Sequence, residues 1–414
     1  MSEKKKLIVI GGGASGFFCA VNAARMSPNL EVCILEKSSQ LLSKVKVSGG
    51  GRCNVTHAVD EVGEMLDAYP RGKNFMRKTL HVFSTGDTEE WFQHRGVSLK
   101  TETDGRMFPV TDRSQSIIDC LMSEAQKFNV AIRLRSEVQT IESSGEGFIL
   151  HVKQTESEQQ MIQADFICIA AGGQPKLSGF RWLTELGLQV ETPVPSLFTF
   201  NIPDKKLHEL MGVVAKDAIV KIPALKVQEK GPVLITHWGL SGPAVLKLSS
   251  RAARDLHDVD YTFEVLVNWT SGYHESSMLE TLKQLRLTVK QKVGSKNPFD
   301  LTSRLWNYLL DKSKIREDDY WTDLTNTTLI ILSRMLTSDR YAVQGKTTFK
   351  DEFVTAGGVR LDEINPLTME SKKIKGLFFA GEIMDVDGIT GGYNFQHAWS
   401  SGYIAAQSIS SLIS

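Results

Sequence analysis

The sequence of 414 residues has no excess of charge of either sign, because its 48 Lys and Arg residues balance its 48 Asp and Glu residues. A chain without a net positive field is an atypical binder of nucleic acid or of anionic membranes. We therefore expect neither a nucleic-acid partner nor a membrane partner. A basic groove restricted to one part of the surface is still compatible with this composition.

Cysteine is scarce, and the cysteines form no C-x-x-C pair. They are Cys19, Cys33, Cys53, Cys120 and Cys168. An odd number of scattered cysteines argues against a disulfide scaffold and a zinc site, and is typical of a reducing compartment. Long apolar runs are also missing, since residues 7–24, after a short basic start, contain four glycines. They are better explained as strand, turn and helix than as a secretory or membrane segment, so we expect a cytoplasmic protein.

Several catalytic and metal-binding motifs are absent. Neither G-x-S-x-G nor H-E-x-x-H occurs, so a hydrolase has little support. The segment Asp385-x-Asp387-Gly388 resembles the start of a calcium loop. Its glycine is misplaced, however, and Gln396 occupies the position of the bidentate glutamate. We therefore expect no metal.

What the sequence does contain is a glycine loop directly after an apolar run, with the spacing Gly11-x-Gly13-x-x-Gly16. In such a loop the first glycine permits the tight turn and the second lets the backbone approach a pyrophosphate. The third lets the helix pack closely on the strand. The helix behind the loop starts near Ala14 and Ser15 and presents free N–H groups to the phosphates. This context predicts nucleotide binding, and the alternative is a glycine-rich turn without a ligand.

The second predicted strand ends at Glu36 and Lys37. A carboxylate about 20 positions after the glycine loop hydrogen-bonds the ribose hydroxyls in dinucleotide-binding folds. Lys37 could meet a 2′-phosphate, but Glu36 would repel one, so an unphosphorylated ribose is favoured. The alternative is a charged pair at a solvated strand end.

A second glycine run lies outside any strand–helix turn. It consists of Ser48, Gly49, Gly50, Gly51, Arg52, Cys53 and Asn54. Consecutive glycines allow close approach of a flat ring or a phosphate, and successive N–H groups can bind an anion. Arg52 and Asn54 would be polar contacts, whereas Cys53 is better explained as a packed thiol. The alternative is a flexible loop.

Near the other end of the chain, Gly381-Glu382 follows an apolar run and precedes a further glycine-containing segment. That segment contains Asp387, Gly391, Gly392, Tyr393, Asn394, Phe395 and Gln396. A helix starting there would point its N–H groups at the N1–C2=O edge of a reduced flavin, where negative charge gathers. A nicotinamide cofactor needs only the first glycine loop. FAD, with its flavin far from its adenosine, is better explained by both ends.

The predicted elements place a nucleotide-binding domain at both ends of the chain. Strands are predicted over 7–10, 30–35, 132–138, 148–152 and 166–171, with a hairpin turn near Gly145, and helices over 17–26, 75–92, 113–128 and 395–412. Prolines near residue 193 mark a boundary, after which 196–268 shows short extended runs and 274–338 is mostly helical. We predict an FAD-binding domain from 1–190 and 346–414, an inserted β-rich unit from 191–273 and 339–345, and a helical insertion at 274–338.

The richest polar–aromatic cluster of the inserted region is His237-Trp238, bracketed by glycine. Such a loop suits a lid or a substrate contact, and a histidine can move a proton near pH 7. We expect His237 and Trp238 to be the catalytic candidates. The alternative is a buried turn with a satisfied histidine, and His397 is a second candidate with the same alternative.

The runs 11–16, 48–54, 237–243 and 387–396 resemble the HI0933-like family of FAD-binding flavoproteins, and the resemblance spans nearly the whole chain. It implies an α/β fold with FAD in a Rossmann-like domain. It also implies an inserted β-barrel-like unit that carries a helical insertion. By matching position it assigns FAD contacts to Ser15, Glu36, Lys37, Arg52, Asn54, Val138, Glu382, Asn394 and Phe395, with Val138 holding the adenine through its backbone.

One further segment belongs to this resemblance. Ala171-Gly172-Gly173 matches the family's Thr-Gly-Gly strand end except in its first residue, and loop 174–180 is shorter than its counterpart. We include Ala171 and Gly172 among the predicted cofactor-binding residues.

We therefore predict an FAD-dependent oxidoreductase that exchanges a hydride between flavin N5 and a small organic substrate. A second G-x-G-x-x-G is missing, so we expect no dedicated nicotinamide domain. The flavin would be reduced by NAD(P)H as a transient electron donor in the substrate cleft, or by another donor. One alternative is an NAD-dependent dehydrogenase without flavin, which segment 381–396 argues against. The other is a flavin-binding RNA-modification or electron-transfer protein without small-molecule turnover, which the charge balance argues against.

Overall fold

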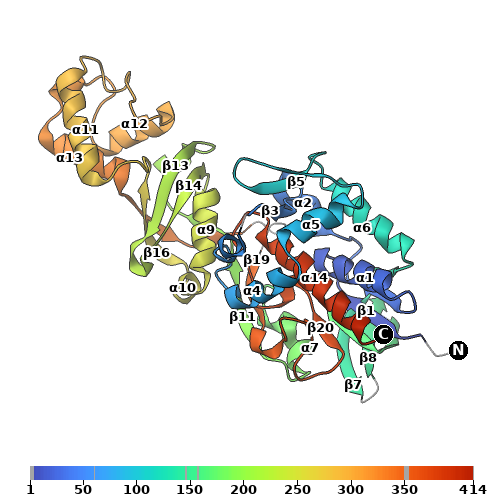
Figure 1. Cartoon of the computed structure of the whole chain (residues 1–414). Helices are drawn as coiled ribbons and strands as arrows, with labels where there is room; N and C mark the ends of the chain where they lie inside the picture. The colour runs from blue at the N-terminus through green and yellow to red at the C-terminus, as the bar shows by residue number, and fades with distance from the viewer. Residues whose placement is uncertain (1–3, 60, 145–146, 156–157, 349–353, 414) are drawn as a thin grey trace. The chain divides into compact units, whose positions relative to one another are not determined.

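The computed structural model describes residues 4–59, 61–144, 147–155, 158–348 and 354–413. The chain divides into two compact units (Figure 1), which we call unit 1 (Met1–Pro195 and Lys350–Ser414) and unit 2 (Ser196–Phe349). Each unit has its own hydrophobic core. The hairpin turn predicted near Gly145 lies outside the described residues.

Unit 1 is built on a five-stranded parallel sheet with the strand order β20-β10-β1-β2-β6. The strands are β1 (Lys6–Ile10), β2 (Glu31–Leu35), β6 (Ala131–Arg133), β10 (Phe166–Ile169) and β20 (Leu377–Phe379). The three central strands are short apolar runs, as expected for strands covered on both faces. The predicted Rossmann-like α/β core is confirmed, and a strand from the C-terminal part completes its sheet.

Two helices from opposite ends of the chain, α1 (Ala14–Met26) and α14 (Tyr393–Ser411), pack against each other. Gly402 makes this packing close, because a Cβ there would lie 2.7 Å from the carbonyl oxygen of Ser15. Figure 1 shows α14, in red, beside α1, in blue. The two glycine-rich ends of the sequence therefore meet in one unit.

The rest of unit 1 surrounds this core. Its other helices are α2 (Ser43–Gly51), α3 (Val62–Leu66), α4 (Lys73–Val82), α5 (Thr85–Gln93), α6 (Gln115–Lys127) and α7 (Arg181–Thr184). It also has three smaller sheets. The first consists of β3 (Thr56–His57), β5 (Arg106–Pro109) and β4 (Leu99–Thr101), and the second is the meander of β7 (Glu137–Ser144), β8 (Gly147–Thr155) and β9 (Glu158–Ala164). The third pairs β11 (Val190–Ser196) with β19 (Val354–Val359). Short 3-10 turns cover Leu177–Phe180, Leu361–Glu363 and Gly381–Ile383.

The helical pattern predicted over 75–92 corresponds to two helices, α4 and α5, separated by a break that the prediction did not include. The first ends at Val82, where Phe83 turns the backbone to an extended conformation, and Ser84 caps the second. The hydroxyl of Ser84 accepts from the N–H of Asp87, and the Asp87 carboxylate accepts from the N–H of Ser84. This capping box satisfies N–H groups that a continuous helix would have paired internally.

Unit 2 contains a seven-stranded sheet with the order β17-β16-β13-β14-β15-β12-β18. Its strands are β12 (Thr199–Asn201), β13 (Val214–Ile222), β14 (Val227–Thr236), β15 (Gly239–Ser241), β16 (Thr262–Asn268), β17 (Asp339–Gln344) and β18 (Lys346–Thr347). The helices of unit 2 are α8 (Lys205–His208), α9 (Pro243–Arg251), α10 (Ala253–Asp258), α11 (Glu275–Thr288), α12 (Ser303–Lys312) and α13 (Asn326–Thr337). Short 3-10 turns cover Pro223–Leu225 and Trp321–Asp323. The expectation of extended runs throughout 196–268 missed α9 and α10. Pro243, at the first turn of α9, is a helix-start signal that we interpreted only as part of a loop.

The helical part of unit 2 is tied to the sheet by a buried cluster, which we call the Asp339 cluster. Asp339 is fully buried at the start of β17 and accepts hydrogen bonds from Trp269 Nε1 (3.1 Å), Tyr341 Oη and Lys312 Nζ. Tyr308 Oη lies 3.3 Å from Tyr341 Oη. Because Tyr308 and Lys312 come from α12, the cluster links that helix to β17 and to Trp269, the residue after β16.

Candidate flavin site

The loop between β1 and α1 carries the first glycine motif. Gly11 has a φ of +115°, and side chains at Gly11 or Gly16 would clash with the backbone oxygens of Ala170 and Gly11, respectively. Around Gly13, in contrast, an added Cβ would meet no heavy atom within 4 Å. No side chain caps the start of α1. This open space beside an uncapped helix N-terminus suits a phosphate group.

A cavity of about 410 Å³ opens at the carboxyl ends of β1 and β2. Glu36, Lys37, Val138 and Ala171, all predicted cofactor contacts, line it. The Glu36 carboxylate accepts from the backbone N–H groups of Gly12 and Ser38, each at 2.8 Å. This fixes a carboxylate beside the nucleotide loop, and the cavity suits the adenosine half of a dinucleotide.

Loop 174–180 and the residues that follow it form another wall of this cavity, and the sequence did not single out Arg181, Trp182 or Glu185. That wall is formed by Gln174, Ser178, Gly179, Arg181, Trp182 and Glu185. The indole N–H of Trp182 donates to the carbonyl oxygen of Gly179 at 3.1 Å, which fixes the ring against the short loop 174–180. An aromatic residue soon after Gly172-Gly173 was the available signal, but only the fold brings it to the same cavity as Val138.

The second glycine run lies at the end of α2, where the backbone leaves helical geometry. Ser48 is extended, with a ψ of 148°, and Gly49, Gly50 and Gly51 have φ values of +57°, +69° and +85°. A Cβ at Gly49 would lie 2.9 Å from the Phe108 ring, whereas Gly50 and Gly51 border open space. The backbone at these two glycines is therefore accessible to a flat ring or a phosphate.

The three residues after these glycines differ in what they can do. Cys53 is buried, and burial raises the pKa of its thiol to about 12, so it is protonated and unsuited to nucleophilic or redox chemistry. Arg52 donates to Glu102 at 2.6 Å and stacks over the Phe108 ring at 4.0 Å, which holds its guanidinium in one place. Asn54 is buried, and its Oδ1 has no hydrogen-bond partner.

Gly381 and Glu382 lie beside the first glycine loop, although the two segments are far apart in sequence. A Cβ at Gly381 would lie 2.8 Å from the Cβ of Ser15. The Glu382 carboxylate accepts from the N–H of Thr355 at 3.0 Å and pairs with Lys44 at 2.5 Å. The sequence analysis did not identify Lys44 or Thr355, and the buried hydroxyl of Thr355 has no partner.

Segment 386–394, which we call the flavin loop, leads into α14. Gly391 and Gly392 have φ values of +140° and +93°, and no side chain caps the helix that starts at Tyr393. The Asn394 side chain braces the loop, since its Oδ1 accepts from the N–H of Gly388 and its Nδ2 donates to the Gly388 carbonyl oxygen. The free N–H groups of this helix start suit the negative edge of a reduced flavin.

Residues further along α14 face inward. Gln396 is fully buried, accepts from the hydroxyls of Thr56 and Thr88, and donates to the carbonyl oxygen of Ser84. Phe395 stacks on Trp399 with ring centroids 5.7 Å apart. Both residues were predicted as cofactor contacts. The structure gives Gln396 packing and hydrogen-bonding partners within the protein, and its contact with the cofactor stays a prediction.

His397 is buried close to the same site. Its Nε2 lies 3.2 Å from the carbonyl oxygen of Gly381, which can only accept, so Nε2 carries the proton and Nδ1 is an acceptor without a partner. Burial lowers the pKa of His397 to about 4. The ring is therefore neutral near pH 7 and is not an acid catalyst in that form.

The described residues fit FAD. Asn54 Oδ1, Thr355 Oγ1 and His397 Nδ1 are buried without a partner, and all three can accept a hydrogen bond. Buried polar atoms are nearly always paired in folded proteins, so three orphaned acceptors around one site indicate a ligand with donors. The ribityl hydroxyls and the flavin N3–H are such donors. The open space at Gly13 and Gly50 leaves room for the phosphates and the ring.

The catalytic candidates His237 and Trp238 belong to unit 2. They form the two-residue turn between β14 and β15, with His237 exposed and its ring centroid 3.6 Å from that of Trp238. An exposed His237 does not match the alternative of a buried, satisfied histidine. Its catalytic role stays a prediction.

Among the residues that the structure describes, no group of three or more His, Cys, Asp or Glu side chains could hold a metal ion. The five cysteines are buried and unpaired. In the same described part of the chain, no helix has both the length and the apolar composition needed to span a membrane.

Comparison with known proteins identifies the group to which this site belongs. Residues 5–408 match the model of the HI0933-like protein Rossmann domain. The chain belongs to the HI0933-like family. It is thus an FAD-dependent oxidoreductase with a nucleotide-binding Rossmann core, as predicted.

Members of the HI0933-like family with similar sequences carry two different names. The chain is 31% identical to a ribosomal RNA dihydrouridine synthase of Escherichia coli (strain K12), over 98% of each chain. It is 30% identical to a protein of the same name from Haemophilus influenzae, over 99% of this chain and 100% of that one. It is 28% identical to a 3-dehydro-bile acid delta(4,6)-reductase of Clostridium scindens, over 96% of this chain and 97% of that one.

Among solved structures, the HI0933-like fold resembles that of 3-ketosteroid delta1-dehydrogenase from Sterolibacterium denitrificans. The TM-score is 0.51 at 11% identity, covering 98% of this chain and 99% of the other. At this identity the likeness concerns the fold alone.

Proposed function

We propose that this HI0933-like protein reduces a carbon–carbon double bond conjugated to a carbonyl group, and that its substrate is a uracil ring in ribosomal RNA. The observation that carries the proposal is the flavin site in a chain that matches two ribosomal RNA dihydrouridine synthases over nearly its full length. This follows the RNA-modification alternative of the sequence analysis rather than the small-molecule expectation.

The two names among the relatives describe one type of chemistry. In uracil, C5=C6 is conjugated to the C4 carbonyl, and in a 3-oxo-Δ4,6 steroid two double bonds are conjugated to the C3 carbonyl. Either substrate accepts a hydride at a carbon remote from the carbonyl and a proton at a carbon nearer to it. FAD, when bound and reduced, supplies the hydride from its N5.

The chain's own residues would orient and stabilise the cofactor. The uncapped N-terminus of α14 would stabilise negative charge at the flavin edge, and Glu36, positioned by the N–H of Gly12, would hold the ribose. Two electrons must enter for each double bond reduced. We propose NAD(P)H as their source, and a cytoplasmic location, where ribosomal RNA and NAD(P)H are both available.

The distribution of charge along the chain supports an RNA substrate more than the net charge of the whole chain does. Residues 196–349 contain 21 Lys and Arg against 17 Asp and Glu, whereas the rest of the chain contains 27 against 31. Phosphate contacts by Lys and Arg provide most of the non-specific affinity for RNA. The excess of basic residues in unit 2 therefore favours this unit as the RNA-facing part.

A conjugated steroid is the second candidate substrate, favoured by the bile-acid reductase among the relatives. The test presents both substrates to the same FAD-loaded protein. Anaerobic mixtures receive NADPH or NADH and either ribosomal RNA transcribed in vitro, which has no modified nucleosides, or a 3-oxo-Δ4,6 steroid. Mass spectrometry then measures gain of two hydrogens in uridine or in the steroid, with FAD-depleted protein as the control.

Formation of dihydrouridine at a defined position supports ribosomal RNA as the substrate. Reduction of the steroid alone would contradict an RNA substrate and support a conjugated steroid. Flavin reduction by NAD(P)H without either product would contradict both and favour the electron-transfer alternative. We also expect His237→Ala to slow turnover of the true substrate while leaving bound FAD intact. General unfolding of this variant would instead indicate a packing role.

A further inference from the structure

Residues 68–72, which we call the brace, lie against the flavin loop and contact it at several points. The N–H of Ile389 donates to the carbonyl oxygen of Ala68. The hydroxyl of Tyr69 donates to the carbonyl oxygen of Tyr393 at 2.8 Å. The brace therefore contacts both the middle of the flavin loop and the first residue of α14.

The strongest contact joins Arg71 to Asp387. Arg71 donates from Nε and from one terminal nitrogen to the two carboxylate oxygens of Asp387. The Asp387 side chain is fully buried and that of Arg71 is 11% exposed. A buried carboxylate without its cation is strongly destabilising, so this two-point pair sets where Asp387 can lie.

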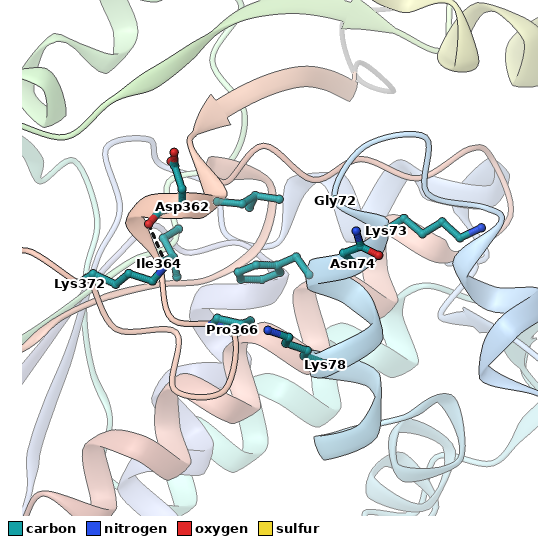
Figure 2. Close-up of a pocket in the computed structure, with 10 residues that line it drawn as sticks. Gly72, Lys73, Asn74, Lys78, Asp362, Ile364, Pro366 and Lys372 are labelled. Atoms are coloured by element: carbon teal, nitrogen blue, oxygen red, sulfur yellow. Dashed lines mark hydrogen bonds between the residues drawn. The ribbon is translucent and has the colours of Figure 1, made fainter.

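Packing next to this pair is equally close. Gly72 has a φ of +79°, and a Cβ there would lie 2.6 Å from Cγ2 of Val386. Gly72 also lines a cavity of about 450 Å³ at the start of α4, shown in Figure 2 with Asn74, Lys78 and Pro366. The close approach of Gly72 to Val386 leaves the brace little freedom to move toward the flavin loop.

The position of Asp387 matters because it lies just before the start of α14. Four residues later, Gly391 and Gly392 form the turn that starts this helix, and Tyr393, its first residue, is held by Tyr69. A helix N-terminus stabilises an anion only over its first turn, so small displacements change the interaction. The sequence predicts Asp387 as a cofactor contact, but its two carboxylate oxygens bind Arg71.

We propose that Arg71 is a positioning residue for the flavin: acting through Asp387, it holds the flavin loop so that the N-terminus of α14 faces the cofactor. The proposal rests on the FAD site and not on the identity of the substrate. Arg71 need not touch FAD to have this effect.

The competing explanation is a purely structural ion pair. A structural pair would change the stability of the protein and weaken oxidised and reduced FAD to the same extent. A positioning pair affects the reduced, anionic flavin more, because that form depends most on the helix N-terminus. The midpoint potential of bound FAD separates the two explanations, since it reports the ratio of the two affinities.

The experiment compares FAD-loaded wild type with Arg71→Lys, Arg71→Leu, Arg71→Leu/Asp387→Leu and the control Arg77→Leu, which changes an exposed arginine of α4. Affinity for oxidised FAD is measured by flavin fluorescence, and the potential by reduction with a reference dye. We expect Arg71→Leu to weaken reduced FAD about tenfold more than oxidised FAD. This lowers the two-electron potential by about 30 mV.

The double variant removes the uncompensated charge, so it should regain thermal stability but keep the lowered potential. Potentials and visible circular dichroism equal to wild type in both Arg71→Lys and Arg71→Leu would overturn the proposal, as would full recovery of the potential in the double variant. If Arg71→Leu does not fold, Arg71→Lys decides alone, because it keeps the charge but loses the two-point geometry. No RNA or steroid is used, so a wrong substrate assignment leaves the result unaffected.

Discussion

The flavin site of unit 1 and the Asp339 cluster of unit 2 are both buried and polar, yet they differ in how their hydrogen bonds are satisfied. In unit 2, the Asp339 carboxylate has partners in Trp269, Tyr341 and Lys312. Around the flavin site, Asn54, Thr355 and His397 each keep an acceptor without a partner. The first arrangement is complete within the protein, whereas the second leaves buried acceptors available to a ligand.

Orphaned atoms alone do not mark a site. Asn307 Oδ1 and Trp321 Nε1 in unit 2 also lack partners. What distinguishes the flavin site is that its orphaned acceptors coincide with uncapped helix starts and with glycines that border open space. A buried cluster whose hydrogen bonds are all made within the protein therefore stabilises the fold, while buried acceptors without partners, next to accessible backbone, suit a cofactor.

The largest effect is expected from breaking the satisfied cluster. Lys312→Met leaves the Asp339 carboxylate buried without its cation, which costs about 3–5 kcal/mol. We expect urea unfolding followed by tryptophan fluorescence to show this loss, with the flavin absorption spectrum of the loaded protein unchanged. Lys290→Met, which changes an exposed lysine of unit 2, is the control. An unchanged unfolding midpoint for Lys312→Met would show that the cluster is not structural.

A second effect concerns the pH dependence of unit 1. Burial lowers the pKa of His397 to about 4 from 6.5, so between these values the unfolded chain binds a proton that the folded chain does not. Stability present above pH 6.5 is therefore lost as the pH falls toward 4, by about 3 kcal/mol. His397→Gln should flatten this slope in urea unfolding at pH 5 and 7.5, and His81→Gln should not. Equal slopes in wild type and His397→Gln would contradict the assignment.

Removing one hydroxyl from each region should change the stability of the FAD-free protein in different directions. Tyr341→Phe in the Asp339 cluster removes a satisfied hydrogen bond and should cost about 1–2 kcal/mol of stability without affecting FAD. Thr355→Val removes an orphaned hydroxyl, so the FAD-free protein should be as stable as wild type or slightly more stable. Its affinity for FAD should fall about fivefold, roughly 1 kcal/mol. Destabilisation of FAD-free Thr355→Val, with FAD binding intact, would remove Thr355 from the site.

The smallest effect in this series concerns the adenosine cavity. Glu36→Ala removes the predicted ribose contact and should weaken FAD retention a few-fold, roughly 0.5–1 kcal/mol. Release of flavin fluorescence on dilution measures the effect, and Glu89→Ala, on the exposed face of α5, is the control. The same affinity as wild type would refute a role of Glu36 in binding ribose.

Local features of the fold were predictable from the sequence. The strand over 7–10 and the helix after the first glycine loop were predicted within a few residues, because periodicity and glycine spacing reflect neighbouring residues. The break at Ser84 and helix α9 were missed, although Ser84 with Asp87 and Pro243 are known start signals. At these positions we gave more weight to the apolar pattern than to the residues that cap or start a helix.

The class of cofactor follows from local sequence, since the glycine spacing at the two ends, Glu36 and the resemblance to HI0933-like proteins depend on residues close in the chain. Which distant groups meet depends on the fold: Arg71 pairs with Asp387, Lys44 pairs with Glu382, and Trp182 lines the same cavity as Val138. Local backbone preferences are encoded by neighbouring residues. Which buried charges form pairs, and which buried acceptors lack a partner, depends on the segments that the core brings together. Patterns of neighbouring residues contain no information on that packing.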